Sequence, residues 1–274
     1  MARWVVLFLL CAALPVLLGE GVGSSVGVDN VATVATVATV ATVATSATTS
    51  AIAATGMAGT AGSIEGSVIY TGVAPQRAVL QMAADPFCVA AHGGQTVLSE
   101  QLVVNDNRTL RWAFVHIREV RSGSLPVGSA DTVVLNQVAC MYAPRVAGLQ
   151  AGGTLRVTNS DQTLHNVSVQ PLNNPSFNVA QPIPGMSTER SFDNAEIMIP
   201  VRCDVHPWMQ AYIGVVEHSY FDVSGEDGSF RLAGVPPGEY VLEAWHETLG
   251  TQTISVTVRE GQTASADFTF GGDR

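Results

Sequence analysis

The sequence predicts an all-β protein made of two β-sandwiches, and three features support this. From residue 63 onward, short runs rich in Val, Ile, Thr and aromatic residues alternate with turn residues. Strong turn signals, Asp227-Gly228 and a Pro-Pro-Gly triplet at 236–238, separate the late runs. No segment has the helical periodicity that an amphipathic helix needs, and only ADPFCVAAHGG is expected to hold a turn of helix.

The expected strands follow one another along the chain as GSVIYTG, TLRWAFVHIREV, DTVVLNQVA, GTLRVTN, HNVSVQ, AEIMIPVRC, AYIGVVE, GSFRLAG, GEYVLEAW, TISVTV and ADFTF. Together they occupy an ordered region of roughly 210 residues, which suits two sandwiches better than one. The expected divisions are a signal peptide at 1–23, a low-complexity tether at 24–62, early strands at 63–130, a metal-binding sandwich at 131–217 and a second sandwich at 218–271. Because 218–271 is short for a sandwich, the early strands are candidates to complete it.

The N-terminus matches a secretory signal. Arg3 precedes the apolar stretch WVVLFLLCAALPVLL, and cleavage is expected between residues 19 and 23. An uncleaved N-terminal anchor is the alternative, because no clean A-x-A site follows. We therefore expect a protein exported to the periplasm, the cell surface or the medium, with no other membrane insertion.

A low-complexity tether follows the signal. The triplet VAT repeats through residues 31–45, and a period of three fits neither a strand nor a helix. The segment also lacks aromatic residues that would start a core, so we expect it to be disordered.

The charge pattern argues against partners that are themselves negatively charged. The formal net charge is −10, and no basic stripe interrupts it, so neither nucleic acid nor an anionic membrane is an expected partner. The acidity either steers a cationic protein partner or serves solubility alone.

The stretch CDVHPWM concentrates three metal ligands, Cys203, His206 and Met209. A thiolate, an imidazole and a thioether suit a copper ion that changes oxidation state, and a second imidazole is needed to complete such a site. His165, at the start of the run HNVSVQ, is the candidate. The alternative is that the cysteine forms a disulfide and the other three side chains pack in a core.

Residues 131–217 resemble the cupredoxin family of blue copper proteins, through AGGTLRVTNSD, the pair His165-Asn166 and the C-x2-H-x2-M spacing, which is closest to amicyanin. The resemblance implies one type 1 copper ion held by His165, Cys203, His206 and Met209. It implies that Asn166 ties the two ligand loops together and that His206 has its ring edge near solvent. Trp208 either borders an apolar docking patch or packs structurally.

Three cysteines, at 88, 140 and 203, follow the signal and allow three pairings. With Cys203 kept as a thiolate by the metal that the resemblance implies, we expect Cys88 and Cys140 to form a disulfide. Two or three free buried thiols are the alternative.

The C-terminal stretch resembles the carboxypeptidase regulatory-like, transthyretin-like β-sandwich family, through D-G-x-F, P-P-G-x-Y and E-G-Q-T-x-x-x-D-F. The early runs IEGSVIYTG and WAFVHI fit that family's opening strands, which favours insertion of the copper sandwich between parts of the second one. The whole layout is similar to exported proteins described as methylamine-utilisation-like.

Other chemistry is not supported. The sequence lacks H-E-x-x-H, C-x-x-C-H, a nucleophile elbow and a phosphate loop, so we expect no enzyme, zinc protease or c-type cytochrome. His218 and His246 are weak candidates for a second metal site, and His116 is expected to be structural.

The function that the sequence favours is one-electron transfer by an exported mononuclear copper protein, with a redox protein such as a cytochrome c or an oxidoreductase as partner. The alternative is a surface module that carries copper or binds a polymer or another partner. In that case the metal is cargo or has a structural role.

Overall fold

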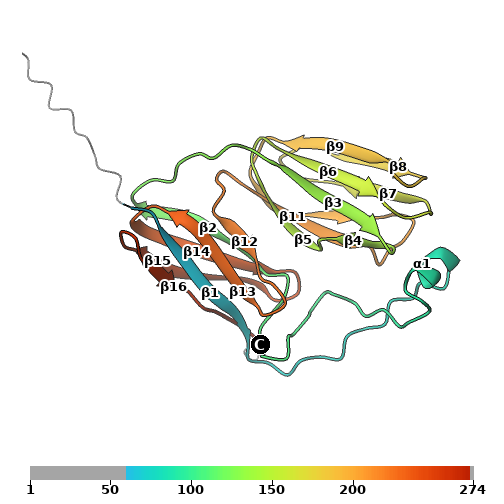
Figure 1. Cartoon of the computed structure of the whole chain (residues 1–274), viewed down its shortest axis with the longest axis horizontal. Helices are drawn as coiled ribbons and strands as arrows, with labels where there is room; N and C mark the ends of the chain where they lie inside the picture. Colours follow the sequence, from blue (N-terminus) through green and yellow to red (C-terminus); the bar gives the residue numbers. More distant parts are fainter. Residues whose placement is uncertain (1–59, 272–274) are drawn as a thin grey trace, which may run out of the picture. The chain divides into compact units, whose positions relative to one another are not determined.

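The computed structural model describes residues 60–271, and over this range the chain is all-β, as predicted (Figure 1). The one short helix of this range, α1 (Pro86–Ala91), lies in the stretch expected to hold a helical turn. The predicted signal peptide and the predicted tether, except residues 60–62, lie outside the described residues. No helix in the described range is long and apolar enough to cross a membrane.

The first sandwich consists of two sheets from the middle of the chain. One sheet has the order β5 (Val146–Gln150), β11 (Gln210–Val216), β10 (Glu196–Arg202), β7 (His165–Val169) and β8 (Phe177–Gln181). The other has the order β4 (Met141–Ala143), β3 (Thr132–Val138), β6 (Gly153–Asn159) and β9 (Ser187–Phe192). The apolar faces of both sheets bury one core, which includes Leu155, Val167, Ile199 and Ile213.

The second sandwich combines early and late strands. One sheet contains β13 (Ser229–Val235), β1 (Gly62–Tyr70), β16 (Thr263–Ser265) and β17 (Phe268–Phe270). The other has the order β12 (Phe221–Val223), β2 (Phe114–Ser122), β14 (Gly238–His246) and β15 (Gly250–Val258). Strand β1 pairs with β13 on one side and runs parallel to β16 and β17 on the other, while β2 lies between β12 and β14. The strands of the first sandwich therefore occur, along the chain, between β2 and β12.

Between β1 and β2 the chain makes a long excursion that contains α1. Figure 1 shows it running from β1 out to α1 and then back to β2. Met82 of this excursion is buried in the core of the first sandwich, and Leu80, Phe87 and Val97 pack against that core. The excursion is thus anchored to the sandwich that carries the candidate ligands.

Every run expected to form a strand contains one, but six strands were not predicted: β4, β5, β8, β9, β12 and β16. Three of them have only three residues, too few to show an alternating pattern. Strand β9, STERSF, is mostly exposed and carries little apolar signal. Strands β5, β9, β12 and β16 pair with strands distant in sequence, which local pattern does not report, whereas β4 and β8 pair with the strands just before them.

Candidate metal centre

The two ligand segments meet because β7 and β10 are neighbours. His165 is the first residue of β7, and Cys203 follows the last residue of β10. The strands pair antiparallel, with Ser168 opposite Arg202, so the start of β7 and the end of β10 lie side by side at the same end of the two strands. This arrangement brings together residues that are far apart in sequence.

The loop from Cys203 to Met209 is closed on itself by backbone hydrogen bonds. The Met209 amide donates to the His206 carbonyl at 2.9 Å, and the Cys203 amide donates to the Met209 carbonyl at 3.3 Å. Pro207 restricts the backbone of His206 and removes a donor from the loop. The loop therefore holds its side chains with little conformational freedom.

Three of the four candidate ligands converge on one point. Nδ1 of His165 lies 2.9 Å from Nδ1 of His206, and Sγ of Cys203 lies 3.9 Å from the same His206 nitrogen. One ligand atom from each of the three lies within 4.8 Å of the other two. Their exposed fractions are 0%, 2% and 3% for His165, His206 and Cys203, and Met209 is fully buried in the same core.

Two carboxylates that were not singled out from the sequence bind the outer nitrogens of these histidines. Asp161 Oδ2 lies 2.8 Å from Nε2 of His165, and Asp85 Oδ2 lies 3.0 Å from Nε2 of His206. A carboxylate accepts hydrogen bonds, so we assign the ring proton to Nε2 in both residues. The Nδ1 atoms, which face one another and the thiol, are then the ring nitrogens available to a metal.

Asp161 also supports the turn between β3 and β4. That turn consists of Ala139 and Cys140, both with positive φ, 52° and 55°, which is unfavourable for residues other than glycine. The Asp161 carboxylate accepts from both of their amides at 2.7 Å. One buried side chain therefore stabilises the turn and orients His165.

Asn166 connects the two ligand segments through its side chain. Its Oδ1 accepts from the Asp204 amide at 2.6 Å, and its Nδ2 donates to Asp204 Oδ2 at 2.9 Å and to Asn178 at 2.8 Å. Asp204 is adjacent to Cys203, so these bonds fix the sulfur-bearing loop to the strand of His165. Outer contacts of this kind orient metal ligands.

Cys88 and Cys140 form a disulfide, and Cys203 is the free cysteine of the described range. The pair thus leaves a buried thiol beside two imidazoles, which is the arrangement that the cysteine count predicts for a metal ligand. The disulfide also joins α1 to the β3–β4 turn, since Cys88 lies in α1.

His206 does not have the exposed ring edge that the cupredoxin resemblance implied. Its Nε2 contacts Asp85, and Sγ of Cys88 lies 3.7 Å from that nitrogen. The reason is the excursion between β1 and β2, which places α1 and the disulfide over this edge. Sequence spacing around the ligands carries no information about that covering segment.

The electrostatics favour a thiolate. Burial raises the pKa of Cys203, but hydrogen bonds from His165 and from the amides at 166, 206 and 205 outweigh burial and lower it. Burial lowers the pKa of His165, but the hydrogen bond to Asp161 and the contact with Cys203 raise it to about 9. Burial lowers the pKa of His206, and the bond to Asp85 only partly offsets this.

The donor set fits copper. Two imidazole nitrogens, one thiolate and a buried methionine are the ligands of a trigonal site with a weak axial thioether. Two lone-pair-bearing nitrogens 2.9 Å apart repel each other unless a proton or a cation lies beside them. The residues present therefore match the ion that the sequence predicts.

Trp208 packs on the ligand loop and is half-buried. Its ring centroid lies 5.0 Å from that of His206, and its Nε1 donates to the Cys140 carbonyl at 3.0 Å. It also borders a small cavity of about 160 Å³ together with Leu80 and Met141. Trp208 is thus a packing residue that also reaches the surface.

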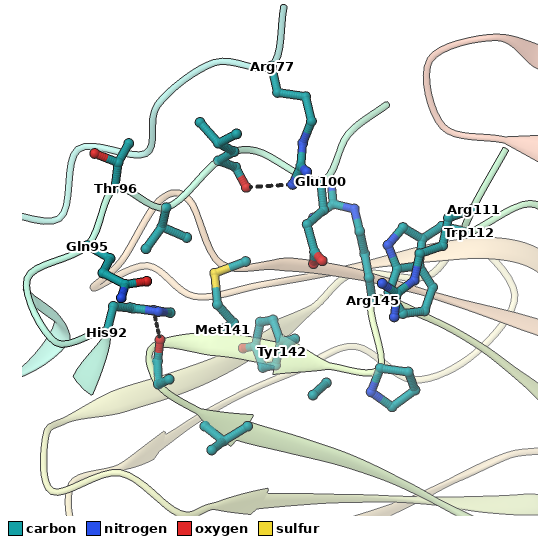
Figure 2. Close-up of a pocket in the computed structure, with 16 residues that line it drawn as sticks. Arg77, His92, Gln95, Thr96, Glu100, Arg111, Trp112, Met141, Tyr142 and Arg145 are labelled. Atoms are coloured by element: carbon teal, nitrogen blue, oxygen red, sulfur yellow. Dashed lines mark hydrogen bonds between the residues drawn. The ribbon is translucent and has the colours of Figure 1, made fainter. Parts of the chain in front are cut away.

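A larger cavity of about 570 Å³ lies beside the β3–β4 turn (Figure 2). Met141 and Tyr142 form part of its wall, with His92, Glu100 and Trp112 among the other lining residues. The Tyr142 hydroxyl donates to the Asn166 carbonyl at 2.8 Å, so this wall contacts the ligand strand directly.

The remaining histidines have other contacts. Nε2 of His92 lies 2.7 Å from the Ala139 carbonyl, and Nε2 of His218 lies 2.7 Å from the Ile117 carbonyl. His116 and His246 are buried. None of these four joins a three-ligand cluster within residues 60–271, so the second metal site considered for His218 and His246 gains no support.

One family model matches the late part of the chain. Residues 209–271 match a sequence profile described as carboxypeptidase regulatory-like domain. That range contains the late strands of the second sandwich and begins one strand earlier, at the end of the ligand loop. No curated protein matches the chain.

Similar solved structures are copper proteins. A Cu-containing nitrite reductase from Thermus scotoductus is 20% identical over 38% of this chain and 26% of its own, with a TM-score of 0.29. A purple cupredoxin from Nitrosopumilus maritimus is 22% identical over 31% of this chain and 98% of its own, with a TM-score of 0.26. A Cu(I) amicyanin variant is 18% identical over 37% of this chain and 97% of its own, with a TM-score of 0.28. With TM-scores this low, the functional assignment rests on the site itself.

Proposed function

We propose that this chain is an exported, mononuclear type 1 copper protein that carries single electrons. The observation that carries the proposal is the buried convergence of a free thiol and two Nδ1 atoms, with Nδ1 to Nδ1 at 2.9 Å and Sγ to Nδ1 at 3.9 Å. Met209, buried in the same core, would supply a weakly bound thioether in this proposal.

Bound copper supplies one-electron chemistry by alternating between Cu(II) and Cu(I). The protein's part is to hold the ligands still and to keep water away from them. Asp161 fixes the tautomer of His165, Asn166 fixes the loop, and the hydrogen bonds between Cys203 and Met209 limit loop rearrangement. Four protein ligands leave no position for a substrate, so we propose a carrier rather than an enzyme.

The proposal includes location and partner. The Cys88–Cys140 disulfide supports export, because disulfides persist in oxidising compartments. The partner is proposed to be a redox protein such as a cytochrome c or an oxidoreductase. The net charge of −10 favours a partner with a positive contact surface.

The test is voltammetry of the copper-loaded chain, residues 24–274. Wild type and the control His218→Asn, which alters a histidine outside the cluster, are expected to show one reversible one-electron couple. Cys203→Ser is expected to abolish it, because the thiolate ligand is lost. Copper bound without a reversible couple would instead favour the carrying or surface-binding module.

A further inference from the structure

The outer edge of His206 is covered by the protein's own excursion. The cover segment, residues 82–94, contains α1, is joined to the β3–β4 turn by the Cys88–Cys140 disulfide, and inserts Met82 into the core of the first sandwich. His92, near its end, contacts the Ala139 carbonyl at 2.7 Å. These attachments all lie around the ligand loop.

Asp85 and Cys88 are the residues of this segment that contact His206, and Asp85 does so through its carboxylate. It caps the N-terminus of α1, where its Oδ1 accepts from the Phe87 amide at 2.8 Å. Its Oδ2 contacts Nε2 of His206 at 3.0 Å and accepts from the Thr163 hydroxyl at 2.7 Å. Thr163 precedes His165 by two residues, so one carboxylate contacts both ligand segments.

We infer that residues 82–94 form a built-in cover of the copper centre and that Asp85 is a positioning residue for His206. The role given to the cover rests on the proposed copper site. That the cover is in place rests only on its own contacts. By accepting from Nε2, Asp85 keeps the Nδ1 lone pair of His206 directed at the metal position. By filling the space at that edge, the cover excludes water and a partner's side chains.

The cover has a consequence for electron transfer. A partner cannot touch the His206 ring edge while the segment is in place, because that edge contacts Asp85 and the disulfide. Trp208, half-buried and with its ring centroid 5.0 Å from that of His206, is the aromatic side chain of the ligand loop and lies between buried His206 and the loop's exposed surface. Trp208 therefore offers electrons a route to the ligand loop that does not require a partner to touch the imidazole.

The first experiment measures copper retention. Copper transfer from the loaded protein to an excess of chelator is expected to be about 10- to 100-fold faster in Asp85→Ala than in wild type. Asp85→Asn is expected to change less, since its amide oxygen can still accept from Nε2, although its NH₂ group then faces the Phe87 amide in place of the capping oxygen. Asp267→Asn, the same change in the second sandwich, is the control and should match wild type.

The second experiment needs no copper. In the metal-free, oxidised protein, Cys203 is the free thiol of the described range, is 3% exposed and lies 3.9 Å from Nδ1 of His206, so its alkylation rate by iodoacetamide reports opening of the cluster that the cover contacts. Asp85→Ala and the double variant Cys88→Ser/Cys140→Ser are expected to be alkylated at least about tenfold faster than wild type. Thr163→Val gives a milder perturbation should either variant fold poorly.

The outcomes separate the two hypotheses. If wild type binds no copper but the variants show the expected alkylation pattern, the proposed electron transfer is wrong and the proposed cover stands. Alkylation and copper release within twofold of wild type in Asp85→Ala would overturn the cover. An alkylation rate that rose only in proportion to a loss of global stability, measured by urea unfolding, would overturn it as well.

Discussion

Replacing Asp161 by asparagine tests how the site is built, because this carboxylate serves three donors at once. Its Oδ1 accepts from the Ala139 amide, and its Oδ2 accepts from the Cys140 amide and from Nε2 of His165. The side chain is 5% exposed, so water cannot replace a lost partner without disturbing the packing. Asparagine keeps the shape but has one acceptor oxygen and one donor group.

The magnitude follows from counting donors. If the amide oxygen of the variant takes the place of Oδ2, the NH₂ group of the variant faces the Ala139 amide. If the oxygen takes the place of Oδ1, the NH₂ group faces both the Cys140 amide and Nε2 of His165. At least one buried donor is left without an acceptor, which costs about 1–3 kcal/mol. The positive φ of the turn at Ala139 and Cys140 adds to the effect, because these bonds hold it.

The effect should depend on pH. Burial raises the pKa of Asp161, but the bonds from His165 and the two amides outweigh burial and hold it below its ordinary value. A carboxyl whose folded pKa is lowered stabilises the protein above its unfolded pKa of about 3.9, and the stabilisation is lost as the pH falls through the folded value. The difference between wild type and Asp161→Asn should therefore narrow below about pH 4.

The assay is urea unfolding of the metal-free proteins, followed by tryptophan fluorescence at neutral pH and at acidic pH. Asp193→Asn is the control, because Asp193 is exposed and its side chain makes none of the hydrogen bonds found within residues 60–271. A loss of less than about 0.5 kcal/mol at neutral pH, or a loss that does not shrink in acid, would refute the role assigned to Asp161.

Three further predictions concern the same region. Copper affinity, measured by chelator competition, should rise about tenfold per pH unit up to about pH 9, because copper must displace the proton of His165; a flat profile would contradict that protonation state. Cys88→Ser/Cys140→Ser should lower the unfolding free energy by up to about 4 kcal/mol, since the disulfide closes a loop with a sequence separation of 52; an unchanged urea midpoint would argue against it. Asn166→Ala should cost about 1–3 kcal/mol by calorimetry and broaden the copper EPR signal, because the bonds to Asp204 are lost; an unaltered EPR signal would exclude a positioning role.

The all-β class and the predicted disulfide could be read from the sequence. Alternating runs and turn residues report local structure, and the ligand loop is contiguous in the chain, so its chemistry is visible in CDVHPWM. His165 could be proposed because a copper site requires a second imidazole. That the structure places its Nδ1 beside that of His206 depends on the pairing of β7 with β10.

The two carboxylates could not be found in the same way. Asp161 lies four residues before His165, a spacing that has no meaning outside a helix, and its contact arises from the turn after β6. Asp85 stands before a proline, which is a helix-start signal, but nothing local shows that this helix lies against His206. The expected exposure of His206 was wrong for the same reason.

The most direct test of the copper centre is the absorption and EPR spectrum of protein loaded with one equivalent of Cu(II), with bound metal counted by mass spectrometry. We predict one copper ion per chain, an intense visible band from the Cys203 thiolate and a narrow copper hyperfine splitting, all lost in Cys203→Ser. Colourless protein with copper bound elsewhere, or Cys203 found in a disulfide, would contradict the proposed site.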